Sequence, residues 1–317
     1  MPPHPTTPAQ LPRILERKRL TTQIDHGLAG SVAFVTGAGR GIGRAIALAL
    51  ASEGAEVAVL ARSEAELDDV AQTIRTLGGR ALVLPADVGD RIATESAVKR
   101  ARDELGEIDI LVNNAAVVWP LEPTAGVVAS EWSAAIGINL IGPVSLTLAV
   151  LPEMLERRWG RIVNVSARVA AQPAMMIGGN AYATSKAALE AHTLNLAAEV
   201  AGTGVTVNAY RPGFVDTSMP AWIRSQPVEK VGSALHERFV QAYEQGTLIA
   251  PERSAAALLD RLKGDENGAI WDAQDSSDSG SSRGSALDGV DVAQAPSPVR
   301  DGGLWRLALT KEKPDTT

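Results

Sequence analysis

The chain of 317 residues contains no cysteine, only four histidines and only 4% aromatic residues. The absence of cysteine excludes disulfides, thiolate metal sites and a cysteine nucleophile. None of the scattered histidines has the spacing of a metal-binding motif such as HExxH, so a metalloenzyme is disfavoured. Acidic residues outnumber basic ones, 37 to 30, for a formal net charge of −7. We therefore expect no nucleic acid and no anionic membrane surface as a partner.

Long hydrophobic runs are also scarce. The longest uncharged apolar stretch extends from about residue 134 to residue 152, and Asn139, Pro143, Ser145 and Thr147 interrupt it. A membrane-spanning helix needs about 20 predominantly apolar residues, so this stretch predicts a buried helix. No apolar run follows the basic segment 17–19 closely enough to form a secretory signal. These features predict a soluble, cytoplasmic protein.

Composition divides the chain into three parts. Residues 1–27 are rich in Pro and Thr and are predicted to be a flexible extension. Residues 274–317 are rich in Gly, Ser, Asp and Pro, which predicts a disordered tail. An apolar segment at 304–309 interrupts this tail. It is either residual hydrophobicity in a flexible end or a segment that docks on the core or on another subunit.

Residues 28–273 alternate short apolar runs with helical patterns. Strands are predicted over 32–35, 56–60, 81–85, 108–112, 161–165, 205–209 and 268–270, and helices over 44–53, 63–77 (with Ser63 as N-cap) and 92–105. Strands that are apolar throughout and separated by helices are typical of a parallel sheet covered on both faces. The predicted fold is α/β: one doubly wound, Rossmann-type domain with terminal extensions.

A glycine-rich turn, TGAGRGIG at 36–43, joins the first predicted strand to a helix. Glycines at such a turn let the backbone approach a pyrophosphate, whose charge is stabilised at the helix N-terminus. The turn predicts a dinucleotide site that includes Gly37, Arg40, Gly41, Ile42 and Gly43.

The end of the second strand predicts which dinucleotide binds. An acidic residue there would bind the ribose 2′-hydroxyl of NAD, whereas a basic residue would bind the 2′-phosphate of NADP. This chain has Arg62 and no carboxylate at that point, and Arg40 offers a second guanidinium. The pattern favours NADP(H), with a surface role for either arginine as the alternative.

At this point the chain resembles the short-chain dehydrogenase/reductase family over residues 28–273. The resemblance rests on TGAGRGIG at 36–43, ADV at 86–88, NNAA at 113–116, INLIG around Asn139, YATSK at 182–186 and NAYRPGFVDT around Pro212. It implies cofactor contacts from Asp87 and Val88 near the adenine, and from Asn114 near its ribose. After Pro212 and Gly213, it implies contacts from Val215 and Thr217 to the nicotinamide carboxamide.

Hydride transfer to or from a carbon atom requires a proton to reach or leave the neighbouring oxygen. Tyr182 is the candidate acid/base, and its ordinary pKa near 10 requires a nearby cation to stabilise the phenolate. Lys186, four residues later, would lie on the same helical face. The resemblance implies that Lys186 also binds the nicotinamide ribose and that Asn139 supports a proton-relay water. The predicted activity is NADP(H)-dependent interconversion of a small-molecule carbonyl and a secondary alcohol.

One position departs from the family pattern. The second serine of the usual Ser-Ser pair binds the substrate oxygen, and here the pair is Ser166-Ala167. Either Ser166 or a loop residue replaces the missing hydroxyl, or turnover is slow or absent. Loss of one such donor typically lowers the rate by about 10²–10³. Two alternatives stay open: an impaired NADP-binding sensor or scaffold, and a different reaction such as isomerisation.

The last expectations concern the substrate and the assembly. The apolar residues between 218 and 246 suit a helix that closes over a hydrophobic substrate, although core packing is equally consistent. Arg157 and Arg158 could form part of a docking patch for an acyl-carrier protein, but residues 201–204 offer no cation, which disfavours such a substrate. The resemblance implies a homodimer or homotetramer, with the helix after Tyr182 at an interface.

Overall fold

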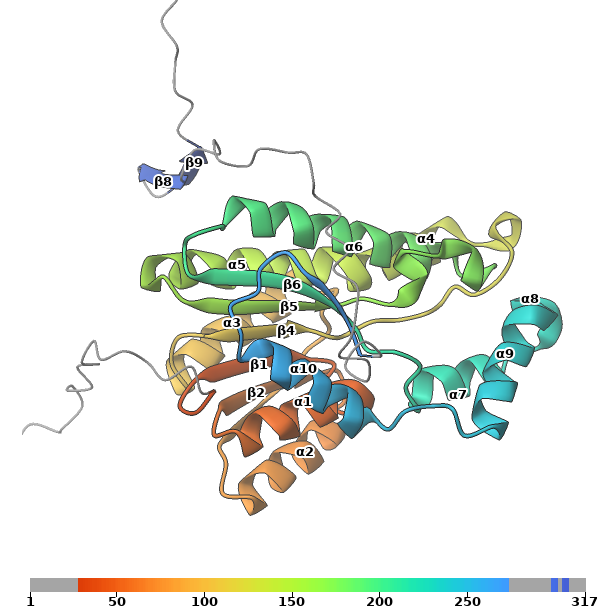
Figure 1. Cartoon of the computed structure of the whole chain (residues 1–317), viewed down its shortest axis with the longest axis horizontal. Coiled ribbons are helices and arrows are strands. Elements are labelled where there is room, and N and C mark those ends of the chain that lie inside the picture. Colours follow the sequence, from red (N-terminus) through yellow and green to blue (C-terminus); the bar gives the residue numbers. More distant parts are fainter. Residues whose placement is uncertain (1–27, 274–297, 302–303, 308–317) are drawn as a thin grey trace, which may run out of the picture.

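A computed structural model describes residues 28–273, 298–301 and 304–307. The predicted extension at 1–27 lies outside the described residues, as does the predicted tail apart from its two short segments. Residues 28–273 form one sheet with helices on both faces (Figure 1). This is the predicted doubly wound α/β fold.

The sheet has seven strands in the order β3-β2-β1-β4-β5-β6-β7, and all neighbouring strands are parallel. The strand order reverses between β1 and β4, and ligands of such sheets bind beyond the carboxyl ends of the strands at this point. Each predicted strand is present with boundaries within two residues. The strands are β1 (Val32–Thr36), β2 (Glu56–Ala61), β3 (Ala81–Pro85), β4 (Ile110–Asn113), β5 (Gly160–Val165), β6 (Val205–Arg211) and β7 (Ile270–Asp272).

Helices cover both faces because the strands are apolar on both sides. In β1, Val35 packs into the cluster shared with α1, α2 and α10, whereas Phe34 packs into the cluster shared with α3, α5 and α6. The predicted N-cap is confirmed, since the Ser63 hydroxyl accepts a hydrogen bond from the Glu66 amide at the start of α2. These helices are α1 (Gly41–Ser52), α2 (Glu64–Thr76), α3 (Arg91–Glu104), α5 (Gly142–Arg157), α6 (Asn180–Glu199) and α10 (Pro251–Leu262).

The longest apolar stretch is helical but only partly buried. The helix α4 (Ala129–Ile136), the π-helical turn η2 (Gly137–Ile141) and α5 continue as one segment. This segment is long and apolar enough to cross a membrane, yet 39% of its most apolar window is buried within the fold. Its inner face packs on the sheet, whereas Ile141 and Leu148 are exposed on its outer face. The predicted buried helix is therefore correct for one face only.

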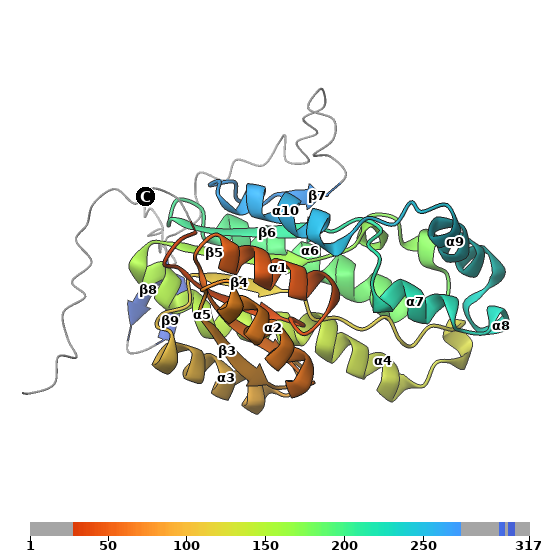
Figure 2. The ribbon, with the colours of Figure 1, turned by 90° about the horizontal axis from the view of Figure 1, so that it is seen from below.

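Three further helices lie together at one end of the sheet in both views (Figures 1 and 2). They are α7 (Ser218–Arg224), α8 (Val228–Val231) and α9 (Ser233–Glu244). Ile223, Leu235 and Phe239 from these helices are buried in one cluster with Tyr182 and Met176. The segment 218–246 therefore packs directly over the predicted catalytic tyrosine.

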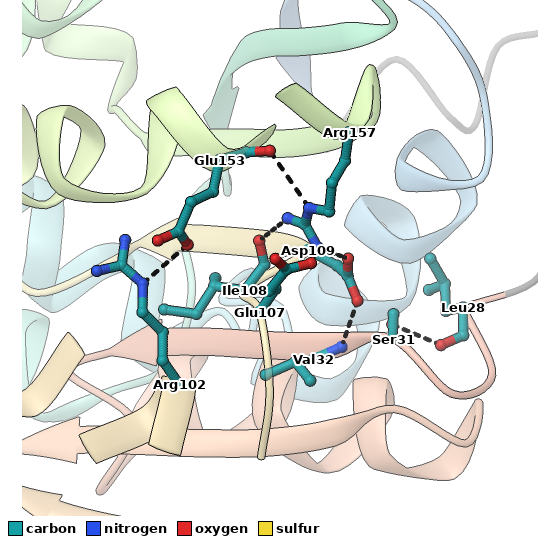
Figure 3. Close-up of polar contacts among 9 residues, drawn as sticks. All are labelled: Leu28, Ser31, Val32, Arg102, Glu107, Ile108, Asp109, Glu153 and Arg157. Carbon is teal, nitrogen blue, oxygen red and sulfur yellow. Dashed lines mark hydrogen bonds and ion pairs between the residues drawn. The ribbon is translucent and has the colours of Figure 1, made fainter. Parts of the chain in front are cut away.

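A polar cluster ties α5 to the amino ends of the central strands (Figure 3). The Arg157 guanidinium lies 2.8 Å from Asp109 Oδ1 and donates a hydrogen bond to the Ile108 carbonyl at 2.8 Å. Asp109 Oδ2 in turn accepts a hydrogen bond from the Val32 amide at 2.9 Å. Arg157 therefore serves the fold at the end of the sheet opposite the carboxyl ends of the strands. The ion pair and hydrogen bond of Arg157 give it a structural role at this end of the sheet.

Within the tail, β8 (Pro298–Asp301) pairs with β9 (Leu304–Leu307) in an antiparallel two-stranded sheet. The second of these strands falls in the apolar segment predicted at 304–309, whose last two residues lie outside the described part of the chain.

Candidate active site

A cavity of about 1030 Å³ lies at the carboxyl ends of the strands. Its walls include Gly37 after β1, Asp87 after β3, Asn114 after β4, Ser166 after β5 and Pro212 after β6. All predicted site residues line this cavity except Gly43 and Asn139, which lie behind its wall. The topology therefore brings together residues that are up to 180 positions apart in the chain.

The glycine-rich turn has the close approaches that its composition predicts. Gly37 and Gly41 have φ values of +63° and +57°, a region of backbone conformation that residues with a Cβ rarely adopt. A Cβ on Gly43 would lie 2.3 Å from the Gly37 carbonyl oxygen and 2.4 Å from Asn114 Nδ2. The turn thus brings bare backbone to the start of α1, where amide groups can bind a phosphate.

Asn114 holds this turn from the neighbouring strand. Its side-chain amide donates hydrogen bonds to the carbonyls of Thr36, at 2.9 Å, and of Gly37, at 3.3 Å. Thr217 contacts the turn from the other side, since a Cβ on Gly41 would lie 3.1 Å from Thr217 Cγ2. Val88 and Val215 are buried in the wall beside them. These residues surround a cradle that fits a dinucleotide.

The two arginines predicted to bind a 2′-phosphate both line the cavity, but each has a carboxylate neighbour. Arg40 Nη1 lies 3.5 Å from Glu66 Oε1, and Arg62 Nη1 lies 3.9 Å from Asp87 Oδ2. The arginine side chains are about two-thirds exposed and the pairs are long, so both pairs are weak. The sequence analysis missed Glu66, which enters the site because α2 begins beside the glycine-rich turn.

Tyr182 and Lys186 lie side by side on α6, as their spacing predicts. Lys186 Nζ is 5.8 Å from the centre of the Tyr182 ring and donates a hydrogen bond to the Val165 carbonyl at 2.6 Å. Burial raises the pKa of Tyr182 to about 12. Burial also lowers the pKa of Lys186 to about 8, an effect that the Glu190 carboxylate opposes. Both residues line the cavity.

Asn139 lies in the π-helical turn and is completely buried. Its side chain forms two 2.8 Å hydrogen bonds with the Val117 backbone and donates a third to Ser185 Oγ at 3.1 Å. Ser185 directly precedes Lys186 on α6. Asn139 therefore joins the cavity wall after β4 to the helix that carries the Tyr–Lys pair. The π-helical turn at this position is typical of functional sites.

Ser166 borders the cavity, but its hydroxyl is bonded to a neighbouring carboxylate. Ser166 Oγ donates a 2.6 Å hydrogen bond to Glu190 Oε1, and Arg211 donates two further bonds to the same carboxylate at 2.8 and 2.7 Å. Ala167 packs in the cluster around Tyr182 and adds no polar atom. The sequence analysis missed Glu190, although it lies on α6 one turn after Lys186 and could have been found by that spacing.

The substrate side of the cavity is lined mainly by apolar side chains. They come from the loops after β4, β5 and β6 and from the helices α7 and α9: Val118, Trp119, Val169, Met175, Met176, Phe214, Met219, Trp222, Ile223, Leu235 and Phe239. Ile223, Leu235 and Phe239 are also buried in the cluster that contains Tyr182. The apolar stripe of 218–246 therefore packs in a core and lines the cavity at once.

Comparison with known proteins agrees with this geometry. The sequence model of the family described as "short chain dehydrogenase" matches residues 31–227. The chain is 44% identical over 233 residues to the short-chain reductase protein NovJ of Streptomyces niveus. This match covers 72% of this chain and 86% of NovJ. It is 34% identical over 244 residues to the 2,3-dihydro-2,3-dihydroxybenzoate dehydrogenase of Bacillus subtilis, which covers 75% of this chain and 91% of that protein.

Solved structures share the fold. The crystal structure of a putative NAD(P)-dependent gluconate 5-dehydrogenase from Beutenbergia cavernae, with bound NADP at low occupancy, has a TM-score of 0.68 and 31% identity; the match covers 78% of this chain and 97% of that one. A metagenomic short-chain oxidoreductase in complex with NADP has a TM-score of 0.63 and 30% identity, over 78% of this chain and 96% of that one. The protein belongs to the short-chain dehydrogenase family, a family of oxidoreductases.

Proposed function

We propose that this protein is an NADP(H)-dependent oxidoreductase that interconverts a carbonyl and a secondary alcohol. The observation that carries the proposal is the position of Tyr182 and Lys186. They border a cavity whose opposite end is the glycine-rich turn at the start of α1. A nicotinamide nucleotide bound along this cavity would exchange a hydride with the substrate carbon.

The residues of the chain would handle the proton. In the reductive direction, the Tyr182 hydroxyl donates its proton to the substrate oxygen as the carbon accepts a hydride. The resulting phenolate is stabilised by the Lys186 ammonium and is then reprotonated from solvent. A pKa of about 8 allows Lys186 to hold or release a proton near neutral pH. Asn139 keeps the helix that carries both residues against the cavity wall.

The preference for NADP(H) is part of the proposal. Arg40 and Arg62 supply two guanidinium groups at the adenine end of the cavity. A 2′-phosphate carries more charge than either carboxylate neighbour, so it would replace Glu66 and Asp87 as the partner of these arginines. Two structural neighbours that contain NADP support this choice.

A second candidate is an impaired family member that binds NADP as a sensor or scaffold. Ala167 favours it, because no hydroxyl is present there and the Ser166 hydroxyl is bonded to Glu190.

For the oxidoreductase, we propose that Ser166 positions Glu190 and that Tyr182 alone binds the substrate oxygen. The enzyme would then be slow by about 10²–10³ without being inactive.

The proposal extends to the assembly. Ile141, Leu148 and Leu194 are exposed on η2, α5 and α6. Burial of such apolar side chains between two copies of the chain would remove them from water, so we propose a homodimer or homotetramer through these helices. Analytical ultracentrifugation of the protein and of a Leu148→Glu variant tests this, and a monomeric native protein would contradict it.

The test of function measures the loss of NADPH absorbance as the protein is offered a panel of ketones. Tyr182→Phe removes only the hydroxyl and is expected to abolish turnover, whereas Tyr243→Phe, at an exposed position on α9, is a matched control. Tight NADPH binding without turnover of any ketone or alcohol would favour the sensor or scaffold. Equal turnover by the Tyr182→Phe variant would contradict the proposed acid/base.

A further inference from the structure

Among the described residues, one arginine that lines the cavity has no carboxylate partner. Six cationic side chains line it: Arg40, Arg62, Arg168, Lys186, Arg211 and Arg238. Four of the arginines have a carboxylate neighbour: Arg40 has Glu66, Arg62 has Asp87, Arg168 has Asp272 and Arg211 has Glu190. Lys186 donates a hydrogen bond to the Val165 carbonyl. In the described part of the chain, Arg238 is paired with no acidic side chain.

Arg238 lies at the edge of the buried face of α9. Leu235 precedes it by three residues, and Phe239 and Ala242 follow it by one and four. These three neighbours are all buried. Residues three or four positions apart are neighbours on a helix surface, so Arg238 lies beside Leu235 and Ala242. Arg238 is itself exposed and lines the cavity beside this stripe.

Aromatic rings hold this guanidinium at the cavity wall. The Arg238 guanidinium carbon lies 5.6 Å from the centre of the Phe214 ring, within the range of a cation–π contact. Phe214 in turn packs against Phe239, with ring centres 4.7 Å apart. Both rings also line the cavity. The charge is therefore positioned over an apolar pocket, while all of its hydrogen-bond donors stay available to a ligand.

We propose that Arg238 binds a carboxylate group of the substrate, remote from the reacting carbonyl, so that the substrate is an apolar or aromatic oxo acid, or the matching hydroxy acid. This inference rests on the proposed function and adds the substrate class. A guanidinium binds a planar carboxylate through two parallel hydrogen bonds. Among the described residues the cavity offers one guanidinium without a carboxylate partner, which suits a singly charged group better than a phosphate dianion.

The apolar walls define the rest of the substrate. Trp119, Met176 and Trp222 line the space between the Tyr182 end and the helices above it. Such side chains favour an aromatic ring or a hydrocarbon chain over a sugar. The reacting carbonyl would then lie at Tyr182, with the apolar part in the pocket and the carboxylate at the rim beside α9.

The test measures binding without chemistry. The protein is saturated with NADP⁺, which has no hydride to donate, and is titrated with 4-oxo-4-phenylbutanoate, its primary amide and phenyl phosphate. Quenching of tryptophan fluorescence reports binding, because Trp119 and Trp222 line the cavity. The acid is expected to bind about tenfold more tightly than the amide, in proportion to one charge-assisted contact. Added salt is expected to reduce this preference.

Two variants separate recognition from folding. Arg238→Met keeps the length of the side chain. It is expected to lower the affinity for the acid to that for the amide, while the affinity for the amide is unchanged. Arg253→Met, at an exposed position of α10, is the matched control and should keep the difference. If Arg238→Met weakened both ligands equally, the residue would be structural and the proposal would fail.

Other outcomes are equally decisive. Absence of acid binding, or tighter binding of phenyl phosphate than of the acid, would overturn the carboxylate assignment. Binding of the acid that depends on Arg238, together with no NADPH oxidation by any ketone, would keep the carboxylate site and overturn the proposed oxidoreductase. The two proposals therefore fail in different experiments.

Discussion

Burial of the Lys186 ammonium should cost folding stability, and the structure gives the size of the cost. The pKa of Lys186 is about 8 in the folded protein, compared with 10.5 for an ordinary lysine. Between these values the unfolded chain binds more protons than the folded chain, so stability rises with pH. At 1.36 kcal/mol per pKa unit, the cost is about 3 kcal/mol at pH 7 and about 1 kcal/mol at pH 10.

Lys186→Met keeps the apolar stem and removes the charge. It also leaves the Val165 carbonyl without its donor, which costs about 1–3 kcal/mol at either pH. Because this second cost is independent of pH, it cancels when the two pH values are compared. The free energy of unfolding of the variant minus that of the native protein should therefore be about 2 kcal/mol larger at pH 7 than at pH 10. The variant should have lost turnover at both.

The assay is urea unfolding of both proteins at pH 7 and pH 10, followed by circular dichroism. Lys99→Met is a control, because Lys99 is exposed on α3 and its replacement should shift stability by less than about 0.5 kcal/mol. If the difference between Lys186→Met and the native protein were the same at both pH values, Lys186 would have an ordinary pKa. The argument for a proton poised near neutrality would then be refuted.

Three further predictions concern the fold, the missing hydroxyl and the cofactor. Arg157→Ala should destabilise the protein by about 3–5 kcal/mol in urea unfolding, because it removes the 2.8 Å ion pair with the buried Asp109 carboxylate and the hydrogen bond to the Ile108 carbonyl; a loss below about 1 kcal/mol would contradict this. Ala167→Ser should raise kcat by up to about 10²-fold if a hydroxyl is missing beside Tyr182, and an unchanged kcat would mean that another group already binds the substrate oxygen. Arg62→Ala should weaken NADPH binding at least about tenfold more than NADH binding, and equal losses in a fluorescence titration would exclude a 2′-phosphate contact.

Local patterns predicted much of this fold and of the site. Apolar runs located the strands because those at the centre of the sheet are buried on both faces, so their composition distinguishes them. The i, i+4 spacing placed Lys186 beside Tyr182 because helical geometry fixes that neighbour whatever surrounds it. The glycines of the turn predicted its position because a positive φ, as at Gly37 and Gly41, favours glycine.

Contacts between distant parts of the chain could not be predicted in this way. Nothing in the sequence near Ser166 shows that its hydroxyl is bonded to Glu190, 24 residues away. The pairing of Arg157 with Asp109 spans 48 residues and gives that arginine a structural role. Arg238 was overlooked because an exposed arginine has no local signature; only the cavity and its paired cations make it distinctive.

The central claim is that this chain transfers a hydride while Tyr182 supplies the proton. Its most direct test is the reduction of 4-oxo-4-phenylbutanoate with NADPH that carries deuterium at C4 of the nicotinamide, with the product analysed by mass spectrometry and NMR. The account predicts one deuterium on the new alcohol carbon with the native protein and none with Tyr182→Phe, although that variant still binds NADPH. Deuterated alcohol in equal amount from both proteins, or none from the native protein with any carbonyl substrate, would contradict it.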